Sequence, residues 1–250
     1  MILAIVQARM SSARLPGKVM QEILGKPLLG YVFERLSYVK KINKIILATS
    51  VEAENNRLVE YVQSQKFDVC RGSEDDVLAR VYEAARRYAP KAIVRVTGDN
   101  PLFDPKICDD LLEFYSKKKV DYACTGKSFA EGLDCEVFSF AALKTAFENA
   151  KLRSEREHVT AYLYKRPEIF KIAVMENETD DSHLRFTVDE PEDFEAVKAI
   201  IENLYSSKAK PFTCQDAKNF ILQHPEISNK NAHVVRNEGY LKSLKEDRVA

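Results

Sequence analysis

The chain has no tryptophan, only eight glycines and five cysteines, and no long run of apolar residues. The cysteines, at positions 70, 108, 124, 135 and 214, are odd in number and scattered, and none forms a Cys-x-x-Cys pair. This spacing argues against a disulfide framework or a zinc knuckle, so we expect mostly core thiols. The first apolar run, residues 2–6, is too short for a signal peptide, and no run approaches the roughly 18 apolar residues of a membrane span. We therefore expect a cytoplasmic protein without a membrane segment.

Neither sign of charge is in excess. Lys and Arg together number 38, and so do Asp and Glu, which gives a formal net charge of zero. Proteins that bind nucleic acid usually carry a basic excess for their phosphate contacts, so this balance argues against that class. Any site for an anion must be local. The 250 residues are enough for one full-sized core, and one domain is the expectation.

Short β-branched runs alternate with segments of helical periodicity, mainly in the first 125 residues. The alternation predicts an α/β fold with βαβ units around a mainly parallel central sheet. Strands are expected at residues 2–6, 44–48, 67–70, 92–96, 121–124, 134–138, 170–175 and 184–188. Helices are expected at residues 28–40, 55–64, 75–88, 105–117, 140–150, 155–165, 191–205 and 214–223. The polar tail from residue 225 onward is expected to wrap a surface or to be partly mobile.

The loop after the first strand holds three cations and no acid. Its sequence, "QARMSSARLPGK", places Arg9, Arg14 and Lys18 where small residues permit a turn with converging amide groups. Because ligands of open α/β sheets lie beyond the carboxyl ends of the strands, these cations point to an oligophosphate. The common phosphate motifs GxxxxGK[ST] and GxGxxG are absent, and a solvated surface loop is the alternative.

Two acids follow two other apolar strands. Asp99 lies in "RVTGDNP" and Asp189 in "RFTVDEPEDF", so both are expected at the carboxyl edge of the sheet. One or two carboxylates together with phosphate oxygens suit Mg²⁺. We expect the two carboxylates within about 6 Å of each other, with the pKa of one of them raised by repulsion. The alternatives are an Asp-Asn-Pro turn at Asp99 and a helix cap at Asp189 or Glu190, with a capping Asp189 pointing away from Asp99.

Two further segments carry polar groups. In "CRGSEDDVLAR", Ser73 and Asp76 have the spacing of a helix cap, and Arg71 or Ser73 is also suited to bind a base or ribose. In "EGLDCEVFS", Asp134 and Glu136 are suited to bind an acceptor, although their period-two spacing equally fits the solvent face of a strand.

The segments "VQARMSSARLPGK", "RVTGDNP" and "FTVDEPEDF", in this order and spacing, resemble the cytidylyltransferase family that makes CMP-activated sugar acids. That family includes the acylneuraminate and 3-deoxy-manno-octulosonate enzymes, and the chain is most similar to the spore-coat-polysaccharide SpsF subgroup. The resemblance extends to "EGLDCEVFS", "REHVTAYLY" and "NEGYLKSL" and so covers nearly the whole chain. Thr97 and Asn100 depart from the "RVQGDEP" pattern of the octulosonate enzymes.

The resemblance implies a three-layer nucleotidyltransferase fold of the GT-A-like type, CTP and Mg²⁺ as ligands, and release of pyrophosphate. It implies a single domain, residues 1–250, with a nucleotide-binding half (1–125), an acceptor-binding and dimerisation half (126–225) and a polar tail (226–250). Its implied nucleotide contacts are Ala8, Arg9, Ser11, Arg14, Lys18, Arg71, Ser73 and Thr97. Its implied catalytic residues are Arg14, Lys18, Asp99 and Asp189, of which Asp99 and Asp189 hold the magnesium, and its implied acceptor contacts are Gly132, Asp134, Glu136, His158 and Arg185.

The mechanism expected from these residues is in-line attack of an acceptor oxygen on the α-phosphorus, with cations stabilising the leaving pyrophosphate. The Lys18 side chain is expected in solvent when the site is empty. A homodimer through residues 126–175 is expected mainly from the resemblance. The carboxylate of a sugar-acid acceptor needs a cation, for which Lys127, Arg153, Arg156 and Arg185 are candidates. A glycosyltransferase of related fold is disfavoured because no clear Asp-x-Asp motif ends a strand, and a non-catalytic nucleotide-binding protein is the third alternative.

Overall fold

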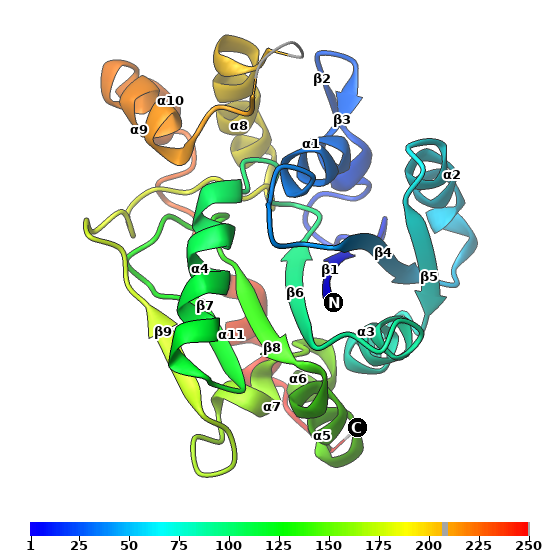
Figure 1. Cartoon of the computed structure of the whole chain (residues 1–250). Coiled ribbons are helices and arrows are strands. Elements are labelled where there is room, and N and C mark those ends of the chain that lie inside the picture. Colours follow the sequence, from blue (N-terminus) through cyan, green and yellow to red (C-terminus); the bar gives the residue numbers. More distant parts are fainter. Residues whose placement is uncertain (207–209, 250) are drawn as a thin grey trace.

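The computed structural model describes residues 1–206 and 210–249 around a seven-stranded sheet with the strand order β5-β4-β1-β6-β8-β7-β9 (Figure 1). The strands of this sheet are β1 (Ile2–Gln7), β4 (Lys44–Ser50), β5 (Asp68–Gly72), β6 (Ala92–Thr97), β7 (Tyr122–Thr125), β8 (Glu136–Ser139) and β9 (Ile172–Met175). A separate hairpin pairs β2 (Glu22–Ile23) with β3 (Lys26–Pro27). The α-helices are α1 (Leu28–Leu36), α2 (Asn56–Ser64), α3 (Val77–Arg86), α4 (Pro105–Lys118), α5 (Phe140–Asn149), α6 (Arg153–Glu157), α7 (Ala161–Tyr164), α8 (Pro191–Leu204), α9 (Cys214–Gln223), α10 (Pro225–Ser228) and α11 (Glu238–Lys245). Two 3₁₀ turns are η1 (Lys18–Met20) and η2 (Ala53–Asn55).

The sheet is mainly parallel. Strand β1 pairs in parallel with β4 and β6, β4 with β5, and β7 with β9, while β8 runs antiparallel between β6 and β7. Parallel neighbours need a crossover connection, which helices such as α1, α2 and α3 supply. The predicted α/β class and the mainly parallel sheet are confirmed.

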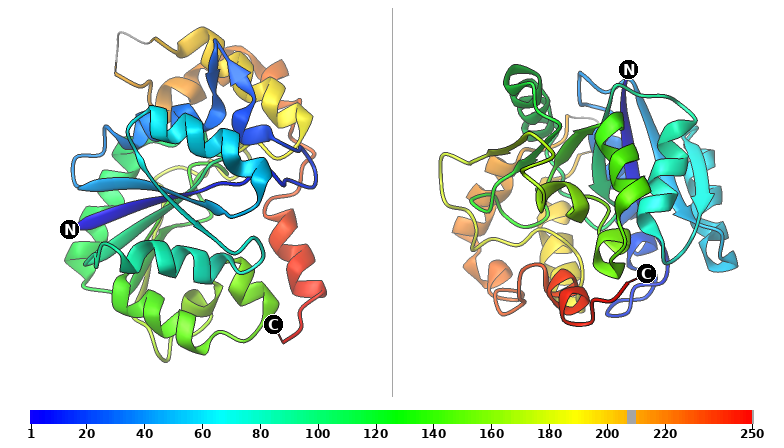
Figure 2. Two further views of the ribbon diagram at one scale, coloured as in Figure 1. Left: turned by 90° about the vertical axis from the view of Figure 1, so that its right-hand side faces the viewer. Right: turned by 90° about the horizontal axis from the view of Figure 1, so that it is seen from below.

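Helices cover both faces of the sheet. Helices α1, α2 and α4 pack on one face against residues such as Val94 and Val96 of β6, whereas α3, α5 and α7 pack on the other against residues such as Ile93. Because side chains alternate along a strand, Arg95 and Thr97 lie on the same face as Ile93. A third apolar cluster joins α8, α9 and the β2–β3 hairpin. Figure 2 shows β1 running from the N-terminus toward the side of the molecule where α11 lies.

Two predicted elements are wrong. Residues 184–188 form no strand of the sheet; their backbone bonds instead to Glu131 and Asp99 in two loops. The predicted helix 155–165 is split into α6 and α7, because His158 leaves the helical conformation (φ −102°, ψ 51°). The described part of the tail carries two helices, α10 and α11, and no helix in residues 1–206 or 210–249 is long and apolar enough to cross a membrane.

Gly132 fixes the loop before β8 against residues 186–187. Its φ is +94°, and a Cβ there would lie 2.3 Å from the backbone nitrogen of Thr187. The neighbouring Glu131 exchanges backbone hydrogen bonds with Leu184 (3.0 Å) and Phe186 (2.7 Å). The contact of Gly132 is therefore with the backbone that leads to Asp189.

We expect Gly132→Ala to lower the free energy of unfolding by about 2–3 kcal/mol, because the backbone must shift to admit the methyl group. Urea denaturation measures this loss. Gly25→Ala is the matched control, since Gly25 also has a positive φ (72°) but nothing within 4 Å of the added Cβ. The control pays only for the left-handed conformation, about 1–2 kcal/mol. Equal losses for the two variants would contradict a close approach at Gly132.

Candidate active site

The ammonium group of Lys18 lies between the carboxylates of Asp99 and Asp189, the two predicted magnesium ligands. The Nζ of Lys18 lies 2.7 Å from Asp99 Oδ2 and 2.7 Å from Asp189 Oδ1. The two carboxylate oxygens are therefore at most twice that distance, 5.4 Å, apart. Asp99 follows the end of β6, and Asp189 precedes α8. The expected proximity of the two aspartates is confirmed.

The expectation that the Lys18 side chain is in solvent is wrong. Lys18 is only 7 % exposed, because the loop after β1 turns inward at Gly17 (φ 71°), whose N–H donates to Met10. Burial alone would lower the pKa of Lys18, but the charges and hydrogen bonds of Asp99 and Asp189 outweigh it and raise the pKa. The lysine is therefore held as a cation between the two carboxylates.

The predicted repulsion at the aspartate pair is wrong for the same reason. Burial favours the neutral form of Asp189, but Lys18, Arg14 and Arg185 together lower the pKa of this carboxyl. Asp189 is also no helix cap: the backbone N–H groups of Asp189 and Glu190 donate to Asp193, each at 2.9 Å. The Asp193 carboxylate thus serves the start of α8 and leaves the side chain of Asp189 free for cations.

Arg14 and Arg185 each contact a different oxygen of the Asp189 carboxylate. Arg14 lies 3.0 Å from Asp189, 3.2 Å from Glu190 and 3.0 Å from Glu238 of α11. Arg185 is buried and pairs with Asp189 (2.9 Å), Asp193 (2.7 Å) and Glu131. Although burial would lower the pKa of Arg185, these carboxylates raise it. Arg185 therefore orders the acids, and its guanidinium has no side facing the pocket described below.

The remaining predicted nucleotide contacts line the ends of β1 and β5. Arg9 pairs with Glu74 at 2.8 Å, and Ser11 donates to the same carboxylate. Ala8 is buried against Gly98, where an added Cβ would lie 2.7 Å from Ala8 Cβ. Arg71 donates to the carbonyls of Ser50, Val51 and Glu52 and so braces the loop after β4.

The cap at α3 differs from the predicted one. Asp76 is the N-cap residue and accepts from Ala79 N–H at 2.9 Å, whereas Ser73 Oγ accepts from Asp76 N–H at 3.0 Å. Ser73 therefore lies before the N-cap residue, and its hydroxyl holds the backbone of Asp76 in place. Contact of Arg71 or Ser73 with a base stays a prediction.

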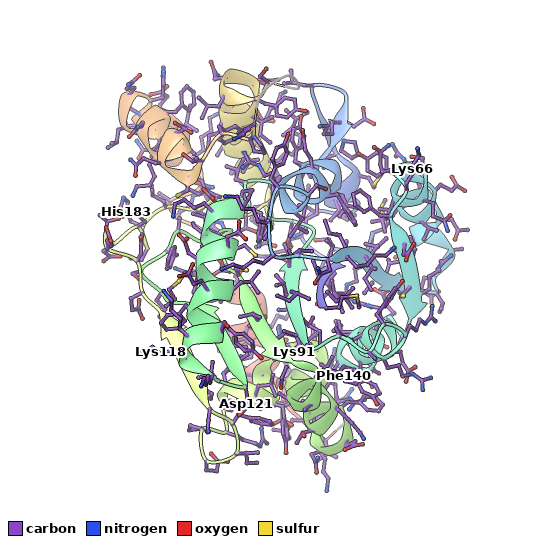
Figure 3. The ribbon with its side chains drawn as sticks, viewed as in Figure 1. Lys66, Lys91, Lys118, Asp121, Phe140 and His183 are labelled. Atoms are coloured by element: carbon purple, nitrogen blue, oxygen red, sulfur yellow. The ribbon has the colours of Figure 1, made fainter. Side chains whose placement is uncertain are left out.

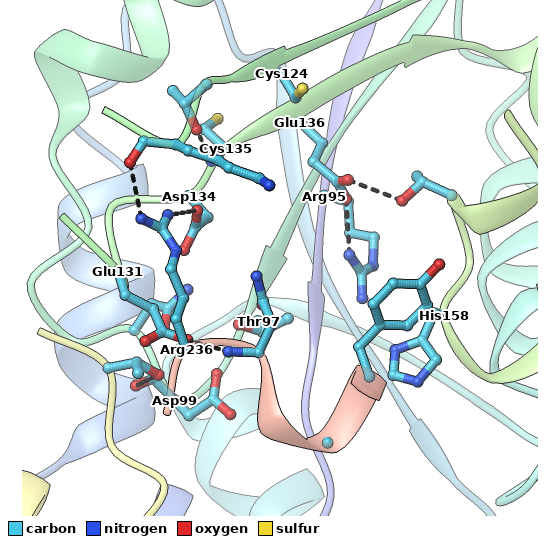
Figure 4. A pocket seen from close by; sticks show the side chains of 18 of the residues that line it. Arg95, Thr97, Asp99, Cys124, Glu131, Asp134, Cys135, Glu136, His158 and Arg236 are labelled. Atoms are coloured by element: carbon cyan, nitrogen blue, oxygen red, sulfur yellow. Dashed lines mark hydrogen bonds and ion pairs between the residues drawn. The ribbon is translucent and has the colours of Figure 1, made fainter. Parts of the chain in front are cut away.

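A pocket of about 560 Å³ opens beside Asp99 and Asp189 (Figure 4). Of the predicted residues, it is lined by Arg14, Thr97, Asp99, Asp134, Glu136, His158 and Asp189. Gly132 and Arg185 lie behind its wall and do not line it. The pocket connects the aspartate pair with the predicted acceptor residues on β8 and before α7.

Residues that sequence reasoning missed complete this pocket. Arg95 lies on β6 opposite Glu136 of β8, as a cross-strand pair with a 2.7 Å ion pair. Arg236 to Tyr240 form another wall, and Arg236 bonds to Asp134 at 3.0 Å and to two carbonyls of the loop before β8. The period-two pattern of β6 placed Arg95 and Thr97 on one face, and that signal was available. Nothing local in the sequence indicated that the tail returns to the site.

His158 is a neutral, half-buried member of the wall. Its Nε2 lies 3.0 Å from Ser243 Oγ, and its ring packs edge-on against Tyr240 with centroids 4.8 Å apart. Burial lowers the pKa of His158 to about 4; Glu157 opposes this, and Arg95 adds to it. His183, by contrast, is exposed at the periphery of the molecule (Figure 3).

We expect the free energy of unfolding to fall as the pH drops from about 6.5 to about 4, because the unfolded chain takes up a proton on His158 that the folded chain excludes. Below about pH 4 this contribution levels off. Denaturation across this range, with His158→Gln and the control His183→Gln, isolates it. The His158 variant should lose less stability over the range than the wild type, and the control should not differ from the wild type. A His158→Gln curve parallel to the wild type would contradict a buried neutral imidazole.

The sheet has helices on both faces and a cluster of cations and acids at its carboxyl edge. This is the architecture of an α/β nucleotidyltransferase. A cytidylyltransferase from Leptospira borgpetersenii serovar Hardjo-bovis has a similar solved structure, with a TM-score of 0.85 and 33 % identity over 91 % of this chain and 96 % of that one. The sequence model of a family described as cytidylyltransferase matches residues 3–227. The chain belongs to the cytidylyltransferase family, whose members are CTP-dependent nucleotidyltransferases.

Individual relatives agree with this placement. The uncharacterized protein MJ1063 of Methanocaldococcus jannaschii is 38 % identical over 96 % of this chain and 97 % of its own length. The spore coat polysaccharide biosynthesis protein SpsF of Bacillus subtilis is 30 % identical over 80 % of this chain and 86 % of its own. A 3-deoxy-manno-octulosonate cytidylyltransferase of Geobacter metallireducens is 33 % identical over 44 % of this chain and 43 % of its own.

Proposed function

We propose that the protein is a Mg²⁺-dependent enzyme that transfers CMP from CTP to a sugar acid and releases pyrophosphate. The acceptor class is a 3-deoxy-2-ulosonic or nonulosonic acid, and the product serves cell-surface polysaccharide synthesis in the cytoplasm. The observation that carries the proposal is the Lys18–Asp99–Asp189 cluster, which lies at the carboxyl edge of the sheet and opens into the pocket. A homodimer through residues 126–175 belongs to the proposal as well.

The aspartate pair fits a magnesium ion. Both carboxylates direct an oxygen at one cationic atom, and carboxylates near phosphate oxygens are the ligands that Mg²⁺ prefers. Asp99 and Asp189 would hold the ion, which supplies charge neutralisation at the phosphates and polarises the acceptor oxygen. Lys18 would compete with the metal, because its ammonium already binds the same two carboxylate oxygens, each at 2.7 Å.

The cations of the first loop give the transfer its electrostatic support. An acceptor hydroxyl attacks the α-phosphorus in line, the bond to the β-phosphate oxygen breaks, and pyrophosphate leaves with the bonding electron pair. Negative charge grows on the leaving group, where Arg14 and Lys18 would stabilise it. Arg9 adds a third positive charge beside the same loop, and His158, neutral above pH 4, is not required as a nucleophile.

Sugar acids as acceptors are supported by the names of the relatives. The Geobacter enzyme is a 3-deoxy-manno-octulosonate cytidylyltransferase, and SpsF is named for spore coat polysaccharide synthesis. The pocket itself offers hydroxyl-binding side chains, including Thr97, Thr125 and Thr160, and tyrosine rings that suit a sugar.

The proposal predicts pyrophosphate release when CTP, Mg²⁺ and the right sugar acid are combined. ATP, GTP and UTP under the same conditions should be poor substrates. A coupled pyrophosphate assay over four nucleotides and a panel of 3-deoxy-2-ulosonic and nonulosonic acids measures both statements. Release of a free nucleoside diphosphate, or a preference for UTP or GTP, would refute the proposal.

We expect Lys18→Ala to lower kcat by ~100-fold or more, the cost of deleting one transition-state charge contact. The variant also leaves Asp99 and Asp189 without their shared cation, so its melting temperature should fall and then recover when Mg²⁺ is added. Thermal melts with and without Mg²⁺ measure this recovery. Lys26→Ala is the control, because Lys26 forms its ion pair with Glu34 (2.7 Å) and not with the two aspartates. A kcat of Lys18→Ala equal to that of the wild type at saturating CTP would contradict the assignment.

A further inference from the structure

Most cations that line the pocket are already paired. Arg14 contacts three carboxylates, and Arg236 bonds to Asp134 and to the carbonyls of Lys127 and Phe129. Arg95 is different. Its Nε donates to Gln7 at 3.0 Å and its Nη1 to Glu136 at 2.7 Å, which uses two of the five guanidinium N–H groups. Within residues 1–206 and 210–249 its Nη2 has no partner and is not buried.

The two bonds of Arg95 fix its orientation. Both oxygens of Glu136 already accept hydrogen bonds within the protein: Oε2 from Arg95, and Oε1 from the hydroxyls of Tyr122 (2.6 Å) and Thr160 (2.8 Å). Glu136 is thereby a positioning residue for Arg95. In Figure 4 Arg95 lies on the same side of the pocket as His158, whereas Arg236 and Asp134 lie on the other side.

We propose that Arg95 binds the carboxylate of the acceptor and so selects acids over neutral sugars. This inference rests on the proposed function and deepens it, because it names the residue that recognises the acid. The free edge of a guanidinium is planar and matches a carboxylate with two N–H donors. The side chain of Arg95 is only 15 % exposed, so a bond to it is little screened by water.

A singly charged carboxylate fits this place better than a phosphate dianion. Arg95 is already paired with Glu136, and Asp134 lines the same pocket, so the second negative charge of a dianion would add to the repulsion from these acids. Lys127 has no partner for its ammonium in the described ranges either, but its side chain is exposed, so water screens its charge. Arg95 is the preorganised cation, and Lys127 is at most an addition at the rim.

The test varies the Arg95 side chain and the carboxylate of the acceptor, each alone and both together. Each acid of the 3-deoxy-2-ulosonic and nonulosonic panel is assayed beside its primary carboxamide, with pyrophosphate release as the readout and CTP affinity measured separately. Wild-type enzyme should prefer the acid by about 30-fold or more in kcat/KM, the loss expected when one partner of a desolvated charge pair is removed. Arg95→Gln should raise the KM for the acid by a similar factor, leave the Kd for CTP unchanged and turn over acid and amide at nearly equal rates. Arg95→Lys should recover part of the preference, and the exposed Arg86→Gln should behave as wild type.

Several outcomes overturn the inference. These are equal use of acid and amide by the wild type, undiminished preference in Arg95→Gln, and turnover of neutral sugars alone. Pyrophosphate release from CTP with the carboxamides of the panel but with none of its acids also overturns it, since an acid acceptor is what the inference claims. The proposed function fails in a different way, through the absence of CTP binding or of pyrophosphate release with every acceptor. Because the wild-type comparison of acid with amide needs no variant, a misfolded Arg95→Gln does not prevent a decision.

Discussion

The placement of one ammonium group between two carboxylates holds the site together. Lys18 comes from the loop after the first strand, Asp99 from the end of β6 and Asp189 from a segment ninety residues further along the chain. No backbone pairing brings Asp99 and Asp189 into one sheet, although the Asp99 carbonyl accepts from Val188 N–H at 2.9 Å. Without a cation the two carboxylates would repel each other at this distance. The loop after β1 must therefore turn inward, and its burial of a charged lysine is stabilised by two ion pairs.

A second layer of charge keeps those carboxylates in place. Arg185 lies behind Asp189 and contacts Asp193 and Glu131, so each acid next to the site has a cation on its inner side. Asp193 accepts from the N–H of Asp189 and from that of Glu190, the N-cap residue of α8, and so acts as the acid of a capping box. Glu131 accepts from the backbone of Asn237, yet burial still raises its pKa, because a carboxylate there is largely removed from water. Asp193 thus orders the site from behind, while Glu131 lines the pocket together with Asp99 and Asp189.

The sequence predicts those parts that depend on local pattern. Alternation of strands and helices predicted β1, β4, β5 and β6, and the positions of Asp99 and Asp189 after apolar runs predicted that these two would lie close together. The insertion of Lys18 between them was not predicted. Residues 184–188 look like a strand because they are apolar and β-branched, but their backbone partners are loops that no local signal identifies. The break at His158 depends on contacts with Ser243 and Tyr240, more than eighty residues away. Arg95 was overlooked because a cation inside a β-branched run carries no motif; only the pairing of β6 with β8 reveals its partner Glu136.

The same charges explain how an enzyme of zero net charge handles polyanions. Every cation of the first loop already has an acid partner: Arg9 has Glu74, Arg14 has Glu190 and Glu238, and Lys18 has the two aspartates. In the proposed site, a triphosphate would exchange partners with these acids, and each displaced carboxylate would need another cation or water. For Asp99 and Asp189 a divalent metal would fill that need, so the proposal makes metal and nucleotide binding mutually dependent. For Glu238 the consequence is structural, since this residue ties α11 to Arg14 and α11 begins in the pocket wall. Under the proposed function, a nucleotide that binds Arg14 would therefore act directly on the wall of the pocket proposed for the acceptor.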